Sequence, residues 1–105
     1  MIILHITTPA EWESGCNSDF YQPAGLAANG FIHACLPNQL LVVLEKWFPG
    51  KRDVLIIEIE TDLLDSRLIF ENLEGGSEQF PHVYGPVTLG AVKAVRTVKF
   101  KDKDE

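Results

Sequence analysis

The stretch Asp53 to Glu60, written DVLIIEIE, constrains the fold more than any other part of the chain. Side chains along a β-strand point alternately to its two faces, and Val54 to Ile57 place apolar groups on both. A strand that is apolar on both faces is typical of the centre of a sheet with both sides covered. The stretch therefore predicts a central strand. Glu58 and Glu60, near its far end, share one face.

Other stretches predict further strands and short helices around this centre. Thr8 has the features of a helix N-cap, with Pro9 at the first helical position and Glu11 three residues after the cap. A second helix is expected from Pro37 to Phe48, with Leu40, Leu44, Trp47 and Phe48 on one face and Pro49-Gly50 ending it. Four more strands are expected at residues 2–6, 30–36, 67–70 and 92–100.

These elements follow one another in irregular order, and this order decides the fold class. The pattern favours an α+β fold with a bent or split mixed β-sheet and two or three short helices, and it disfavours a doubly wound α/β fold. At 105 residues, one domain is expected at 1–100, followed by a charged tail at 101–105.

Composition excludes several classes of function. The net charge of −6 and the scattered basic residues oppose binding to a nucleic-acid polymer. The apolar runs are too short to span a membrane, and the apolar start, Met1 to Leu4, lacks the features of a signal peptide. Cys16 and Cys35 form no disulfide framework, and both are expected to be reduced. We therefore expect a cytoplasmic protein. Its oligomeric state is left open.

The stretch Phe80 to Pro86, written FPHVYGP, holds two prolines, a glycine, a histidine and two aromatic rings. Each proline removes a backbone donor and fixes φ, so the run is not expected to form a helix or a central strand. We predict a stiff loop that presents His82 and Tyr84 at a fixed place. A loop that only caps a sheet is the alternative.

The three histidines are His5, His33 and His82, and each lies near a strand end or in this loop. On a strand, His5 faces the same way as Thr7, and His33 the same way as Cys35. The histidines are interpreted either as polar residues at the edge of the core or as parts of one shared pocket.

Two other kinds of site use the same residues. His5, His33, Cys35 and His82 are suitable zinc ligands, but no metal-binding spacing motif is present. Cys35 is a nucleophile candidate if a histidine from another strand activates it. Its apolar strand favours a buried, inert thiol instead. We predict no metal site.

Carboxylates at strand ends are the remaining candidates. Glu58, Glu60 and Glu71 lie on or just after strands, where a carboxylate can accept a hydrogen bond from a ribose hydroxyl. Glu60 is expected to pair with Lys93 or Lys99 on the outer face of the sheet. Which of Glu58 and Glu71 faces a pocket is left open. Neither a dinucleotide-binding glycine fingerprint nor a P-loop occurs.

The order of these motifs resembles the bacterial domain-of-unknown-function family nine-fifty-two, which also occurs in plants. The motifs are His5-Ile6-Thr7, Trp12, Gly30-Phe31-Ile32-His33, Glu71-Asn72-Leu73 and FPHVYGP. The resemblance covers about residues 3 to 98, and the combination of GFIH with FPHVYGP is its most specific part.

The resemblance implies a fold like that of ADP-ribosyltransferases, which use NAD. By that similarity His5, His33 and Glu71 are catalytic candidates, while Thr7, Phe31, His82 and Tyr84 are ligand-binding candidates. His5 would hold a ribose or an amide, Tyr84 would stack on a ring, and Glu71 would orient a ribose hydroxyl. The arginines that clamp phosphates in the related RNA phosphotransferases have no counterpart here. Two functions therefore stay open: ADP-ribosyl transfer or hydrolysis with NAD, and non-catalytic binding of a small metabolite or a protein segment.

Overall fold

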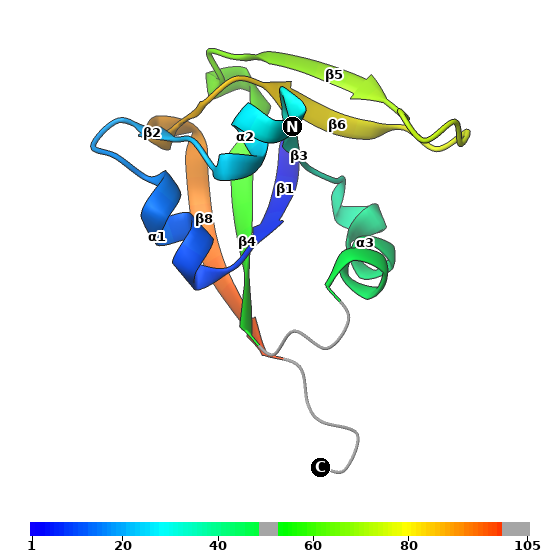
Figure 1. The fold of residues 1–105 in the computed structure, drawn as a ribbon, viewed down its shortest axis with the longest axis horizontal. Coiled ribbons are helices and arrows are strands. Elements are labelled where there is room, and N and C mark those ends of the chain that lie inside the picture. Colours follow the sequence, from blue (N-terminus) through cyan, green and yellow to red (C-terminus); the bar gives the residue numbers. More distant parts are fainter. Residues whose placement is uncertain (49–52, 100–105) are drawn as a thin grey trace.

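The computed structural model describes residues 1–48 and 53–99, which form an α+β fold (Figure 1). The predicted helix stop at Pro49-Gly50 and the predicted tail at 101–105 lie outside these residues. The helices are α1 (Pro9–Gly15), α2 (Ala24–Asn29) and α3 (Leu40–Trp47), with 3-10 turns η1 (Pro37–Gln39), η2 (Thr61–Leu63) and η3 (Leu89–Ala91). The strands are β1 (Ile2–Thr7), β2 (Phe20–Tyr21), β3 (Ile32–His33), β4 (Asp53–Glu60), β5 (Arg67–Glu71), β6 (Phe80–Tyr84), β7 (Val87–Thr88) and β8 (Val92–Lys99).

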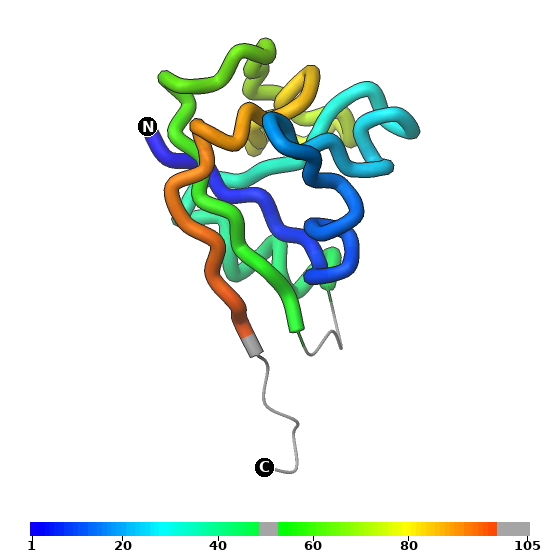
Figure 2. The backbone as a smooth tube through the Cα atoms, turned by 90° about the vertical axis from the view of Figure 1, so that its left-hand side faces the viewer, coloured from blue at the N-terminus to red at the C-terminus, as the bar shows by residue number. Residues whose placement is uncertain are grey.

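The sheet is split, as expected. One part has the strand order β1-β4-β8, a second has the order β3-β6-β5, and β2 pairs with β7. All of these pairs among the described strands run antiparallel. Figure 2 shows β1, β4 and β8 side by side, with β4 in the middle. The prediction of a central strand at Asp53–Glu60 is confirmed.

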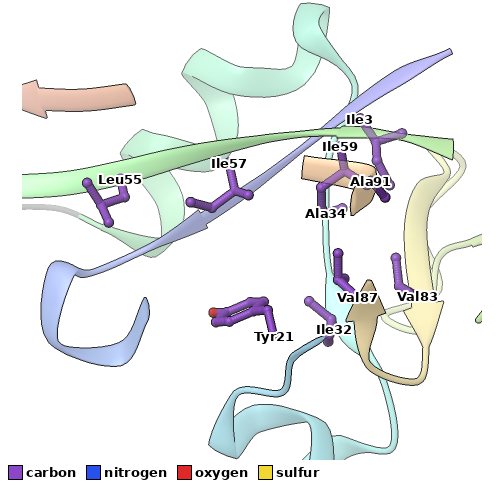
Figure 3. Close-up of a cluster of buried hydrophobic side chains, with 10 residues drawn as sticks. All are labelled: Ile3, Tyr21, Ile32, Ala34, Leu55, Ile57, Ile59, Val83, Val87 and Ala91. Atoms are coloured by element: carbon purple, nitrogen blue, oxygen red, sulfur yellow. The ribbon is translucent and has the colours of Figure 1, made fainter. Parts of the chain in front are cut away.

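Each face of β4 packs on its own hydrophobic cluster. Leu55, Ile57 and Ile59 join the first cluster, drawn in Figure 3, in which Tyr21 is fully buried. Val54 and Ile56 belong to the second, which also holds residues of β1, Cys35 and Leu44. Burying side chains of this size contributes about 1.5–3 kcal/mol each. Because side chains alternate along DVLIIEIE, the single strand β4 contributes to both clusters.

The chain passes from one part of the sheet to the other just after β3. His33 pairs with His82 of β6, whereas Cys35 pairs with Leu4 of β1. The Cys35 amide donates to the Leu4 carbonyl at 2.7 Å, and the Leu4 amide donates to the Cys35 carbonyl at 2.8 Å. The two sheets therefore meet at Ala34, and residues on either side of it face the same opening.

The prediction that FPHVYGP is a loop was wrong for its first five residues. Phe80–Tyr84 is β6, the central strand between β3 and β5. Pro81 is tolerated because its carbonyl accepts from the Ala34 amide at 3.0 Å. In an antiparallel pair the nitrogen and the carbonyl of one residue point to the same neighbouring strand. The Pro81 nitrogen, which has no hydrogen to donate, therefore points toward the end of β3, and no hydrogen bond between β6 and β5 is lost.

The helices follow their predicted signals with one exception. The Thr8 hydroxyl accepts from the Glu11 amide at 3.2 Å, which confirms the N-cap of α1. The stretch from Pro37 begins as the turn η1 and continues as α3, which buries Leu44 against the second cluster. Trp47, expected on the same face, is instead 54% exposed. No described helix is long and apolar enough to cross a membrane.

Candidate functional site

A cleft of about 710 Å³ opens where the two sheets separate. The cleft is lined by β1, β3 and the first half of β6, and by α2, α3 and the chain between β5 and β6. In Figure 1, α3 lies beneath the end of the β5–β6 hairpin. Of the seven candidate residues from the sequence, the lining includes His5, Phe31, His33, Glu71 and His82. The volume is within the range of small-molecule sites.

Strand register brings the aromatic candidates to one face of the β3-β6-β5 sheet. His33 is directly opposite His82, and the residues 80, 82 and 84 share this face because side chains alternate. The buried Phe31 ring stacks on His82 at a centroid distance of 4.2 Å and meets the edge of His33 at 4.8 Å. The Tyr84 ring lies 5.3 Å from Phe31. Phe31, His33 and His82 therefore form a ring wall of the cleft with His33 at its exposed end, and Tyr84 packs against Phe31 from outside the cleft lining.

Glu71 stands at the edge of this wall, held by two hydrogen bonds. His82 Nδ1 donates to Glu71 Oε1 at 2.9 Å, and the Tyr84 hydroxyl donates to the same oxygen. The bond from Tyr84, followed by that from His82, lowers the pKa of Glu71 below its ordinary value. The described residues make no hydrogen bond to Oε2. Glu71 is thus an oriented carboxylate with one oxygen available to a ligand.

His33 is exposed, whereas the other two histidines, His5 and His82, are buried. Partial burial, and then the nearby His82 ring at 5.2 Å, lower the pKa of His33. The ring is therefore neutral at pH 7 and able to accept a proton. Trp47 of α3 lies across from it, with ring centroids 6.4 Å apart.

His5 borders the cleft, but both of its ring nitrogens are bonded inside the protein. Nδ1 donates to the His33 carbonyl at 2.6 Å, which leaves Nε2 to accept from the Tyr21 hydroxyl at 2.9 Å. Burial lowers the pKa of His5 and keeps the ring neutral. His5 therefore fixes the backbone of His33 where the two sheets meet.

Thr7 is buried and lies outside the cleft lining. Its hydroxyl donates to Glu11 Oε2 at 3.1 Å and lies 3.4 Å from the Tyr21 hydroxyl. Tyr21 was not identified from the sequence. Burial raises the pKa of Tyr21 to about 12, so its hydroxyl stays protonated and donates. Its short strand and polar surroundings carry no motif that could have marked it.

The thiol and zinc alternatives gain no support from the geometry. Burial raises the pKa of Cys35 to about 11, so the thiol is protonated at neutral pH and is a poor nucleophile. Within residues 1–48 and 53–99, no group of three or more His, Cys, Asp or Glu side chains is arranged to hold a metal ion.

The structure separates the three strand-end carboxylates. Glu71 faces the cleft, whereas Glu58 pairs with Arg96 of β8. Glu60 binds the terminal ammonium of Met1 at 2.8 Å, and not Lys93 as predicted. The side chain of Lys99, the other predicted partner, lies outside the described residues. Glu60 reaches the ammonium of Met1 because the next residue, Ile2, pairs directly with Glu60 across β1 and β4.

Comparison with known proteins gives one family and one solved fold. The family model described as "Protein of unknown function (DUF952)" matches residues 6–95. The crystal structure of protein CC0527 from Caulobacter crescentus, a structural genomics target, is similar with a TM-score of 0.82 and 27% identity, covering 96% of this chain and 89% of that one. Its solution NMR structure gives a TM-score of 0.78 and 30% identity, covering 98% and 88%. No curated protein matches the chain significantly.

Proposed function

The chain belongs to the DUF952 family, and on that premise we propose that its cleft binds a nucleotide-like ligand and acts in ADP-ribosyl transfer or hydrolysis, with NAD as the first candidate. The observation that carries the proposal is the ring wall of Phe31, His33 and His82 beside an oriented Glu71 carboxylate. The division of the sheet at the cleft also supports an ADP-ribosyltransferase-like fold, for which a bent or split sheet is expected.

In this proposal Glu71 and His33 act on the ligand. Glu71 Oε2 accepts a hydrogen bond from a ribose hydroxyl, and the carboxylate stabilises the positive charge that develops at the anomeric carbon. The bond from that carbon to the nicotinamide nitrogen breaks, and its electron pair leaves with the neutral nicotinamide. Water or an acceptor hydroxyl attacks the carbon and gives its proton to the neutral His33 ring.

The other candidates support these two residues. His82 and Tyr84 hold Glu71, and Phe31 packs against His82 and His33. His5 acts through the His33 backbone, and Thr7 acts through Tyr21 and Glu11. We therefore assign His5 and Thr7 positioning roles in place of direct contact with the ligand.

Non-catalytic binding in the same cleft is the second candidate, and the charge of the lining favours it. Four glutamates and one lysine line the cleft, and no arginine of the described residues does. A diphosphate needs several donors of positive charge. In this case the ligand packs against the ring wall and no bond of the ligand is cleaved. Glu71 then only accepts a hydrogen bond from the ligand.

The test combines calorimetric titration with NAD and ADP-ribose and a chromatographic assay for released nicotinamide. We expect NAD to bind and nicotinamide to appear, with release about a hundredfold slower in Glu71→Gln and His33→Gln. Glu13→Gln, an exposed carboxylate of α1 outside the cleft, is the matched control and should match the unmodified protein. Binding of NAD without release would favour the second candidate, and absence of heat with both ligands would contradict both uses of NAD.

A further inference from the structure

The cleft is strongly acidic for a site that receives a nucleotide-like ligand. Its charged lining consists of Lys46 and the four carboxylates of Glu11, Glu71, Glu74 and Glu78. Aromatic side chains, among them Phe31 and Trp47, line the same cleft. Carboxylates beside aromatic faces attract cations and oppose phosphates.

A cation of the protein itself already occupies the mouth of the cleft. Lys46 Nζ lies 5.0 Å from the centroid of the Trp47 ring and 2.9 Å from Glu74 Oε2. Both charged side chains are more than half exposed, at 55% and 60%. This contact shows that one aromatic face and one carboxylate of the lining hold an ammonium group together.

One buried ring nitrogen in the cleft lining has no partner within the protein. His82 is 95% buried, because only 5% of it is exposed, and its Nδ1 hydrogen goes to Glu71. The other ring nitrogen, Nε2, forms no hydrogen bond to a described residue. His82 lines the cleft, so a polar group of the ligand is the natural partner of this nitrogen.

Two rings at the mouth can admit a flat group between them after a small side-chain movement. The His33 and Trp47 rings are inclined by only 30°, with centroids 6.4 Å apart. A planar ring between them requires about 7 Å, which is two carbon–carbon contacts of about 3.5 Å. Trp47 is exposed, so a small rotation of its side chain supplies the difference.

We propose that the part of the ligand that enters this cleft is a planar organic cation without phosphate groups, with its ring between His33 and Trp47 and a polar group directed to Nε2 of His82. The inference rests on the proposed function in using the same site, and it names the chemical class that the site accepts. Any phosphate of a larger ligand lies outside the acidic lining.

The test uses three flat probes that differ in charge: N-methylquinolinium, neutral quinoline and anionic AMP. Binding is followed by two-dimensional NMR of the labelled protein, through the backbone amides of Phe31 and His33 and the Trp47 indole. We expect N-methylquinolinium to bind about tenfold more tightly than quinoline, and AMP to leave these signals unchanged.

A substitution of Lys46 tests whether a positive charge in the cleft weakens the binding of a cationic ligand. Lys46→Met removes the resident cation and should tighten N-methylquinolinium binding several-fold, whereas Lys93→Met, an exposed lysine of β8 outside the cleft, should not change it. Equal binding of the cation and quinoline, tighter binding of AMP, absence of binding by all three probes, or weaker cation binding in Lys46→Met would each overturn the inference. Nicotinamide release from NAD is measured separately, so charge selectivity and the proposed reaction fail independently.

Discussion

Replacing Tyr21 with phenylalanine tests whether the buried network behind the cleft stabilises the fold. The change removes one hydroxyl and leaves the ring, so the substitution of Tyr21 opens no large cavity in the first cluster. It leaves His5 Nε2 buried without its donor at 2.9 Å, while Nδ1 still donates to the His33 carbonyl.

The expected loss follows from the cost of a buried polar group without a partner. That cost is about 1–3 kcal/mol. In a domain of this size each kcal/mol lowers Tm by about 4–8 °C. Chemical denaturation gives the free energy of unfolding of Tyr21→Phe, and a thermal melt gives the shift in Tm.

Tyr84 is the matched control, because the chain has two tyrosines and each donates to a different acceptor. Water can replace the Tyr84 hydroxyl at the partly exposed Glu71, so Tyr84→Phe should change stability less than Tyr21→Phe. Equal stability of Tyr21→Phe and the unmodified protein would refute the role given to the His5–Tyr21 bond.

Three further predictions concern other parts of the molecule. Gly85→Ala should destabilise the fold by about 1–3 kcal/mol in chemical denaturation, because Gly85 has φ +153° and an added Cβ would lie 2.4 Å from Ser66 Oγ; an unchanged midpoint would contradict this. The free energy of unfolding should fall as pH falls below about 6.5. The pKa values of His5 and His33 are lowered in the folded protein, so the histidines of the unfolded chain are protonated first as the pH falls. The stability that the two neutral histidines contribute is therefore present above the unfolded pKa and lost below it. Thermal melts between pH 7.5 and 5 check this, and a constant Tm would count against it. Iodoacetamide should modify the half-buried Cys16 before Cys35, whose buried thiol has a pKa raised to about 11. Mass spectrometry of the digested protein gives the order of modification, and modification of Cys35 first would contradict this prediction.

Much of the fold could be predicted because its signals are local. The two apolar faces of β4 and the Thr8 cap depend on residues close together in the chain, and both are confirmed. β6 could not be predicted as a strand, because its tolerance of Pro81 depends on where β3 ends. Trp47 has the spacing of a core residue, and only the position of α3 beside the cleft leaves it exposed.

The candidate site divides in the same way. The convergence of Phe31, His33 and His82 was accessible from their motifs, since GFIH and FPHVYGP pair as β3 and β6. The bonds that separate the role of His5 from that of His33 join residues 16 and 28 positions apart. No local pattern reports such contacts, so both histidines were equal candidates until the structure placed Tyr21 beside one of them.

The most direct test of the cleft as a ligand site is an NMR titration of the labelled protein with NAD. Signals of Phe31, His33 and His82 are expected to shift together and saturate, while signals of Lys93, on β8 outside the cleft, stay in place. Saturation with shifts confined to residues outside the cleft, or no shift at millimolar NAD, would contradict it.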